Sequence, residues 1–114
     1  MTTIYKIITA DEWRAAAAAG VFRGAAVDLS DGFIHFSTAE QVQETAARHF
    51  AGRDGLVLVA FHDGALGDGL RYEPSRAGAL FPHLYGTLDP ALALWVRPLP
   101  RGADGAHAFP ELAP

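Results

Sequence analysis

Cysteine is absent from this chain of 114 residues, and asparagine is absent as well. Without cysteine there is no disulfide bond, no thiolate ligand for zinc and no thiol nucleophile, which fits a reducing compartment. Long apolar runs are also missing, because the runs 56–61 and 91–96 are far shorter than the roughly 20 residues that span a bilayer. The first residues (MTTIYKIITADEW) do not have the basic and apolar regions of a secretory signal peptide. We therefore expect a cytoplasmic protein with no membrane partner.

Basic residues are few and scattered along the chain. Nine lysine and arginine residues stand against thirteen acidic ones, so the net charge is −4 at pH 7. There is no basic stripe along which a phosphate backbone could lie, and general nucleic-acid binding is not expected. Lys6, the single lysine beside eight arginines, lies in an apolar stretch with Ile4 and Ile8 on its own face. Its charge must reach water or line a polar cleft, unless it only protects the edge of a sheet.

The hydrophobic pattern predicts one α+β domain with strands dominating its second half. Half of the chain is hydrophobic, so it can build a core without disulfide bonds. Capping boxes that begin at Thr9 and Ser37 predict two helices, at 10–19 and about 39–50. Strands are predicted, in chain order, at 3–8, 32–36, 56–61, 70–73 and 91–97.

The last part of the chain is less regular. Residues 81–87 are expected to be irregular or strand-like, and Pro82 should exclude a central position because it has no N–H to donate. Beyond Pro98 the chain is rich in proline, glycine and alanine and shows no periodicity. We therefore expect a domain of residues 1–98 followed by a loosely ordered tail, 99–114.

The segment 31–38 (DGFIHFST) is the most informative part of the sequence. After an Asp-Gly turn, strand alternation places Phe33 and His35 on one face. The helix predicted to begin just after this strand would bring free backbone amides beside His35. Together with the hydroxyls of Ser37 and Thr38, these groups suit an anionic or polar ligand. The alternative is a buried structural histidine with hydroxyls that only cap the helix.

A second segment, 81–86 (FPHLYG), carries His83 and Tyr85 two residues apart, so in an extended chain they project to the same side. Both side chains can serve in hydrogen bonding, stacking or proton transfer. The alternative is a proline-containing corner whose aromatic rings seal the core. Upstream, Arg71 and Glu73 share one face of a strand, either as an ion pair or as a catalytic pair.

The two segments together predict a site. We expect His35 and His83 to lie within one ligand's reach of each other and to open into one cavity near Lys6. No two histidines have the helical spacing of a metal motif such as HExxH, and no metal site is predicted. Phosphate-binding loops, dinucleotide-binding glycine motifs and nucleophile–base motifs are missing as well.

These segments, in this order and spacing, resemble a bacterial family called domain of unknown function 952. The resemblance rests mainly on IYKI at 4–7, DGFIHFST at 31–38 and FPHLYG at 81–86, and it covers about Ile4 to Val96. It implies the fold of the ADP-ribosyltransferases, which bind NAD in a cleft between two small β-sheets. On this expectation the sheets form a split sandwich or partly open barrel with two helices.

The resemblance also implies roles for individual residues. Lys6 falls where enzymes of that class place a histidine or arginine that holds the NAD ribose, and His35 falls on the strand that meets the nicotinamide. Glu73 is the candidate for a late glutamate that activates the acceptor, although His83 and Tyr85 can occupy that region instead. The tRNA 2′-phosphotransferases of the same superfamily work without this glutamate.

The predicted site therefore has two groups of residues. The catalytic candidates are His35, His83 and Glu73, and the ligand-binding candidates are Lys6, Trp13, Ser37, Thr38, Arg71 and Tyr85. NAD is expected as a substrate, with no resident cofactor. Three functions stay open: binding of NAD or an ADP-ribosyl or nucleotide ligand with ADP-ribosyl- or phosphotransferase-type activity, a non-catalytic metabolite-binding module, and a metal-assisted hydrolase that uses the two histidines.

Overall fold

A computed structural model describes residues 2–112 of the chain. The strands are β1 (Thr3–Thr9), β2 (Ile34–His35), β3 (Ser37–Thr38), β4 (Leu56–His62), β5 (Leu70–Pro74), β6 (Leu80–Leu84) and β7 (Trp95–Pro98). The α-helices are α1 (Ala10–Ala19), α2 (Ala26–Asp31) and α3 (Val42–His49). Short 3₁₀ helices are η1 (Asp63–Gly69), η2 (Arg76–Gly78) and η3 (Pro90–Leu92).

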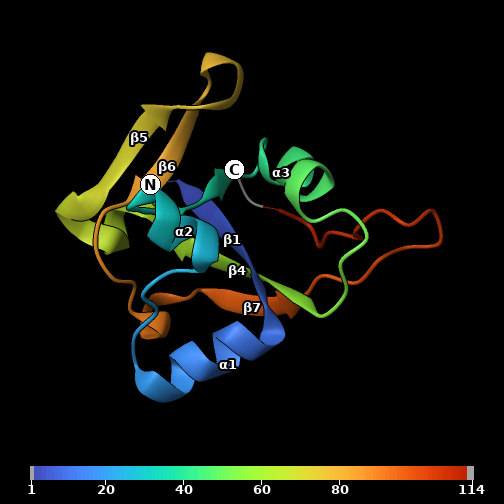
Figure 1. Cartoon of the computed structure of the whole chain (residues 1–114), viewed down its shortest axis with the longest axis horizontal. Helices are drawn as coiled ribbons and strands as arrows, with labels where there is room; N and C mark the ends of the chain where they lie inside the picture. Colours follow the sequence, from blue (N-terminus) through green and yellow to red (C-terminus); the bar gives the residue numbers. More distant parts are fainter. Residues whose placement is uncertain (1, 113–114) are drawn as a thin grey trace.

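The strands form two antiparallel sheets, and neither sheet closes on itself. The larger sheet has the order β3-β1-β4-β7 and the smaller sheet has the order β2-β6-β5. Figure 1 shows the β5–β6 hairpin rising away from the larger sheet, with α1 at the opposite end of the molecule. The prediction of a mixed α+β chain with two small open sheets is confirmed.

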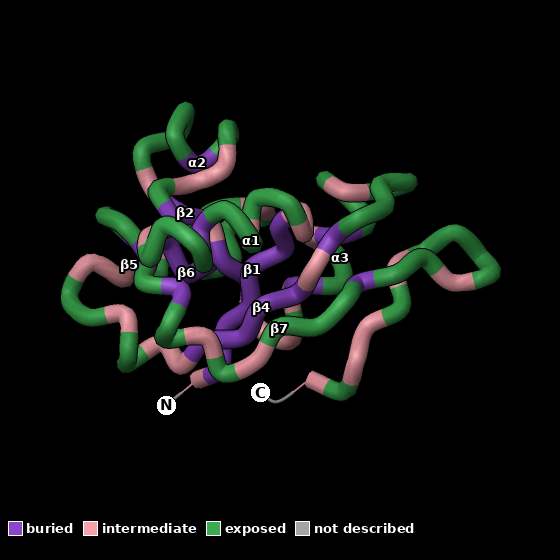
Figure 2. The backbone as a smooth tube through the Cα atoms, turned by 90° about the horizontal axis from the view of Figure 1, so that it is seen from below, coloured by how far each residue is buried: buried purple, intermediate pink, exposed green. Residues whose placement is uncertain are grey.

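The two central strands carry the core. β1 and β4 pair along seven residues, from Thr3–His62 to Thr9–Leu56, and both are buried along most of their length (Figure 2). One face of this sheet packs Ile4 and Phe61 against α1 and the smaller sheet. The other face packs residues of α3 and the later chain against a second apolar cluster. The sheet is therefore covered on both faces, as a continuous apolar strand such as 56–61 requires.

The predicted start and end of α1 are confirmed. The Thr9 hydroxyl accepts a hydrogen bond from the backbone N–H of Glu12 at 3.0 Å. Gly20 ends the helix with φ 76°, a left-handed conformation that glycine adopts without strain. This cap fixes the direction in which β1 continues into α1.

The predicted helix at 39–50 was wrong at its beginning. Ser37 and Thr38 form β3, which pairs with β1, and α3 begins only at Val42. The Thr38 N–H donates to the Gln41 side chain at 3.1 Å, and the Ser37 hydroxyl bonds the Thr45 hydroxyl at 2.9 Å. The free edge of β1 offered these residues a backbone partner, so the expected helix amides do not lie beside His35.

Two further predictions are corrected by the structure. The short helix α2 was not predicted, because its Ncap residue, Ala25, has no capping side chain. β6 is the central strand of its sheet despite Pro82. The Pro82 carbonyl accepts from the Phe36 N–H at 3.0 Å, so the side of β6 without a donor faces the point where β2 ends. Because β2 is only two residues long and ends before this point, it needs no N–H from Pro82.

The end of the chain makes contacts with the domain. β7 is shorter than the predicted 91–97, because residues 90–92 form η3. Leu99 is 1% exposed, and Phe109 and Leu112 pack against the second apolar cluster. That residues 99–114 are less ordered than residues 1–98 stays a prediction. Within residues 2–112 no helix combines the length and apolar character that crossing a membrane requires.

Candidate functional site

His35 and His83 face each other from neighbouring strands. The β2–β6 register pairs them directly, and their ring centroids are 5.6 Å apart. The Phe33 ring stacks on His83 at 4.0 Å between centroids and lies 4.6 Å from His35. Its contact with both imidazoles restricts their rotation. The structure thus brings the two motif segments together through paired backbones and one shared aromatic ring.

Both histidines line a cavity of about 630 Å³. This volume lies within the range of roughly 300–1,000 Å³ that is typical of small-molecule sites. The cavity lies between α2 and α3, which flank β1 in Figure 1. Its polar side chains include Lys6, His35, Ser37, Thr45, Arg76 and His83. Several polar groups from distant parts of the chain therefore meet around one space.

The cavity follows an open strand edge. β3 pairs only with Ile4 and Tyr5 of β1. Beyond that pair, residues 6–9 have no strand partner on the β3 side within the described chain, and all of them line the cavity. A free strand edge presents backbone N–H and C=O groups that require hydrogen-bond partners. This edge adds backbone donors and acceptors to the side chains that surround the cavity.

Asp28, on α2, is a buried acceptor beneath His35. Its side chain is 1% exposed, and its carboxylate oxygens lie 2.9 and 3.1 Å from Lys6 Nζ. The same carboxylate lies 2.6 Å from His35 Nδ1 and accepts from the backbone N–H of Ala25 and of His35. A buried carboxylate with this many donors is fully paired. Asp28 therefore holds α2, β1 and β2 together under the site.

The pKa of Asp28 shows that its carboxyl group is ionised beside Lys6. Burial raises the pKa of Asp28, but the hydrogen bond from His35 and the charge of Lys6 outweigh burial and lower that pKa to about 2. Burial lowers the pKa of Lys6 below its ordinary value, while the charge of Asp28 opposes this effect. Two of the three ammonium protons of Lys6 are committed to Asp28. Lys6 lines the cavity, but its charge is already compensated.

His35 has carboxylates on both ring nitrogens. Nδ1 lies 2.6 Å from Asp28 and Nε2 lies 2.9 Å from Asp31. An ionised carboxylate only accepts hydrogen bonds, so both nitrogens must carry a proton while both carboxylates are charged. In this arrangement His35 has no ring nitrogen left for a ligand. It is not available as a base.

His83 is arranged differently. Its Nδ1 lies 2.8 Å from Glu73 Oε1, and its side chain is 7% exposed. Because the Glu73 carboxylate can only accept, Nδ1 carries the proton, and in the neutral ring Nε2 keeps its lone pair. No hydrogen bond to Nε2 comes from the described residues. His83 thus has the tautomer of a general base oriented by a carboxylate.

Glu73, Tyr85 and Arg71 support His83 from outside the cavity lining. The Tyr85 hydroxyl donates to Glu73 Oε1 at 2.7 Å, and the Arg71 guanidinium lies 5.6 Å from the Tyr85 ring centroid. The hydrogen bonds from Tyr85 and from His83 lower the pKa of Glu73. A carboxylate kept ionised in this way fixes the orientation and tautomer of the imidazole.

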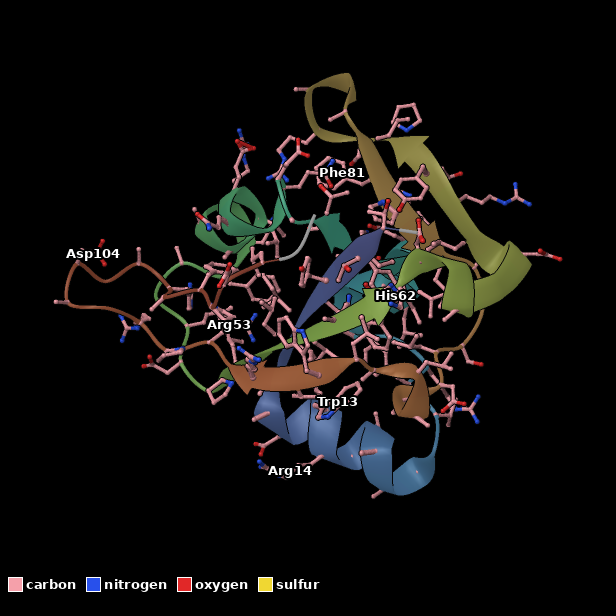
Figure 3. All side chains as sticks on the ribbon, turned by 180° about the vertical axis from the view of Figure 1, so that it is seen from behind. Trp13, Arg14, Arg53, His62, Phe81 and Asp104 are labelled. Atoms are coloured by element: carbon pink, nitrogen blue, oxygen red, sulfur yellow. The ribbon has the colours of Figure 1, made fainter. Side chains whose placement is uncertain are left out.

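Two further sequence candidates, Trp13 and Thr38, also lie outside the cavity lining. Trp13 packs edge-on against Phe61, with ring centroids 6.5 Å apart. Figure 3 shows Trp13 beside α1, far from Phe81 of the cavity wall. Thr38 pairs with Ile4 in the sheet, and its N–H is taken by a side chain. The structure therefore brings together Lys6, His35, Ser37 and His83, with Glu73, Tyr85 and Arg71 behind them.

Arg76 lines the cavity and was not a candidate from the sequence. Its Nη2 donates to Thr45 Oγ1 at 3.0 Å, and its Cζ lies 4.9 Å from the Phe81 ring centroid. Its Nη1 is buried without a hydrogen-bond partner among the described residues. A buried donor left unpaired costs about 1–3 kcal/mol. The next residue, Ala77, has φ 56°, a left-handed conformation that costs a non-glycine residue roughly 1–2 kcal/mol.

Sequence reasoning missed Asp28 and Arg76 for different reasons. A lysine inside an apolar strand requires an acidic partner, so Lys6 was a signal that one of the aspartates is buried. Nothing in the residue types around Arg76 marks it, because its place depends on contacts between the hairpin turn and α3 that form only in the folded chain. No group of three or more His, Cys, Asp or Glu residues in 2–112 is placed to hold a metal ion.

Comparisons with known proteins agree with one another. The chain matches a solved crystal structure of protein CC0527 from Caulobacter crescentus at 50% identity and TM-score 0.90, covering 94% of each chain. A solution NMR structure of CC0527 matches at 52% identity and TM-score 0.84, covering 93% of this chain and 91% of that one. No curated protein matches the chain. The family model described as "Protein of unknown function (DUF952)" matches residues 7–96, and the chain belongs to this family.

Proposed function

We propose that the cavity binds a nucleotide-type ligand, with NAD or an ADP-ribosyl compound as the first candidates. On this proposal His83 acts as the base of an ADP-ribosyl- or phosphotransferase-type reaction. The observation that carries the proposal is the pair of histidines on one cavity wall. One of them has an aspartate on each ring nitrogen, and the other has a glutamate on Nδ1 and leaves Nε2 without a partner among the described residues.

The resemblance to ADP-ribosyltransferases suggests where such a ligand would lie. Those enzymes hold NAD between two small β-sheets, and here the cavity follows the open edge of β1 beside the smaller sheet. The free backbone groups of residues 6–9 would meet polar atoms of the ligand. His35 would form part of the ligand-binding wall beside His83, with Lys6 and Asp28 holding it in place.

The proposed chemistry needs one proton acceptor. In ADP-ribosyl transfer the acceptor oxygen attacks the anomeric carbon of the ribose, the glycosidic bond breaks and nicotinamide leaves. The proton of the acceptor hydroxyl would pass to His83 Nε2, while Glu73 keeps the proton on Nδ1 and stabilises the imidazolium that forms. Glu73 is then a positioning residue, which differs from the role implied by the resemblance.

Thermal unfolding scans with NAD, with ADP-ribose and with zinc, each added separately, test this proposal. A ligand at a hundredfold excess over its dissociation constant stabilises the folded state by about 2.7 kcal/mol. We expect stabilisation by NAD or ADP-ribose in the wild type and its loss in His83→Ala. His62→Ala is the matched control, because His62 does not line the cavity. No stabilisation by either compound would contradict the proposal, and stabilisation by zinc alone would favour the hydrolase.

Turnover separates the enzyme from the non-catalytic binding module. Wild-type protein incubated with NAD and a mixture of nucleophilic acceptors should release nicotinamide, which chromatography detects. Release should fall at least a hundredfold in His83→Ala, in line with the 10²–10⁴-fold contribution of a general base. Tight binding of ADP-ribose without any nicotinamide release would support the binding module instead.

A further inference from the structure

We infer that Arg76 forms an anion subsite in this cavity and that it receives a phosphate group of the ligand. The inference rests on the proposed function in that it uses the same cavity, and it adds the chemical class of the ligand, a phosphate ester or anhydride. Nothing in the sequence motifs or in the resemblance points to this residue. Its contacts in the folded chain point to it instead.

The guanidinium of Arg76 is fixed in place but not saturated. Thr45 accepts a hydrogen bond from Nη2, and the Phe81 ring lies under the guanidinium plane. Nη1 is buried and has no partner among the described residues. A guanidinium offers its N–H groups as a planar fork, which matches two oxygens of a phosphate. The unpaired Nη1 is therefore the donor that a bound oxyanion would use.

The charge of Arg76 is also poorly compensated. Its nearest carboxylate is Glu44, 3.4 Å from Nε, and that side chain is 59% exposed and is shared with Arg48 at 3.5 Å. Exposed pairs of this kind interact weakly, because solvent and salt screen them. Lys6, by contrast, is bound to the buried Asp28. Among the cavity cations, Arg76 thus combines a buried unpaired donor with a weak counter-charge.

The chain around Arg76 holds it against the cavity. The hairpin turn is closed by Ser75 N–H to Ala79 O at 2.9 Å and by Ala79 N–H to Arg76 O at 3.1 Å. The turn keeps Ala77 at positive φ, and strained residues of this kind cluster at ligand sites. The Gln41 side chain joins α3 to the start of β6 by a bond of 2.7 Å to Leu80 O. Arg76 therefore lies on a braced hairpin.

The distance to His83 suits one ligand. Phe81, beneath Arg76, and His83 are two residues apart on β6, so their side chains share a face about 6.8 Å apart. Both line the cavity, and Figure 3 labels Phe81 near the turn of the β5–β6 hairpin. A ligand with a phosphate at Arg76 can reach His83 with a neighbouring group. Nucleotides and ADP-ribosyl compounds have this form.

Titration with inorganic phosphate at constant ionic strength, followed by amide chemical shifts in ¹H–¹⁵N spectra, tests the subsite. We expect saturable shifts at residues 75–79 and 45, and at least a tenfold loss of affinity in Arg76→Gln. Arg76→Lys keeps the charge without the fork and should lose affinity severalfold. Arg48→Ala is the matched control, because Arg48 shares Glu44 but does not line the cavity, and its affinity should stay within twofold.

The outcomes separate this inference from the proposed function. Phosphate binding that is kept in His83→Ala and lost in Arg76→Gln supports the subsite, even if NAD and ADP-ribose do not bind. Wild-type affinity in both Arg76 variants, equal losses in the Arg48 control, or no saturable shifts in the wild type would overturn it. ADP-ribose binding that ignores Arg76 would overturn the subsite and leave the proposed function standing.

Discussion

Glu73 Oε1 lies 2.8 Å from Nδ1 of His83, and this contact leaves Nε2 as the unpaired ring nitrogen of a residue that lines the cavity. The opposite histidine, His35, has both nitrogens on carboxylates. The two imidazoles, whose ring centroids are 5.6 Å apart, therefore differ in the hydrogen-bond partners of their nitrogens. This difference is the basis of the roles assigned to them.

Replacement of Glu73 by glutamine should change the tautomer of His83. A carboxylate can only accept from Nδ1, whereas an amide can also donate to it, so the proton is no longer held on Nδ1. We expect ¹⁵N shifts of the wild-type imidazole to report one tautomer and those of Glu73→Gln to report a mixture. Glu40→Gln, the same change at an exposed residue that does not line the cavity, is the control. An unchanged tautomer in Glu73→Gln would contradict the role given to this carboxylate.

Asp28 should make stability depend on acid pH. The pKa of Asp28 in the folded chain is about 2, below the ordinary 3.8, so its contribution is present above pH 3.8 and is lost as the pH falls through 2. A shift of this size corresponds to roughly 2–3 kcal/mol of unfolding free energy. Urea unfolding between pH 5 and pH 2 measures it. Asp28→Asn should remove this part of the slope, and Asp104→Asn in the exposed tail should keep it.

Loss of Lys6 alone should be more harmful than loss of the whole ion pair. Lys6→Met leaves the Asp28 carboxylate buried without its counter-charge, and breaking buried pairs in this way costs about 3–5 kcal/mol. The double variant Lys6→Met with Asp28→Asn should lose less than the sum of the two single changes. Arg14→Met, which breaks an exposed pair with Asp11, should change stability little. Additive effects of Lys6→Met and Asp28→Asn in urea unfolding would contradict the coupling.

A chain that ends at Pro98 should still fold, with reduced stability. Truncation removes the buried Leu99 and the packing of Phe109 and Leu112 on the second apolar cluster. Losses of buried aliphatic and aromatic side chains run at about 2–5 kcal/mol each when they leave cavities, and less where the surface can adjust. Circular dichroism and thermal scans of 1–98 beside the full chain measure this. An unfolded 1–98 would show that the domain boundary lies beyond residue 98.

Local patterns predicted the parts of the fold that local chemistry determines. The strands at Thr3 and Leu56 follow from apolar runs, and the helix after Thr9 follows from a hydroxyl three residues before a glutamate. The same capping signal at Ser37 failed, because the free edge of β1 lies beside it and pairs with Ser37 in β3. That edge exists only in the folded chain.

The candidate site also has features that local patterns predicted and features that they did not. Alternation predicted that Phe33 and His35 share a face, which the ring contact of 4.6 Å confirms. The β-pairing that sets His35 opposite His83 joins segments far apart in sequence, and no local signal gives its register. Arg76, in the hairpin turn, reaches Thr45 on α3 across 31 positions of the sequence, so its role depends wholly on tertiary structure.

Isothermal titration calorimetry of ADP-ribose against the wild type, His83→Ala and His62→Ala tests the central claim most directly. We expect the wild type and His62→Ala to bind with equal affinity, and His83→Ala to bind at least tenfold more weakly, a loss of about 1.4 kcal/mol, with its melting temperature close to that of the wild type. A buried structural histidine behaves differently, because its removal lowers stability by about 1–3 kcal/mol through the unpaired partner. No heat of binding in the wild type, together with a large loss of stability in His83→Ala, would contradict the account.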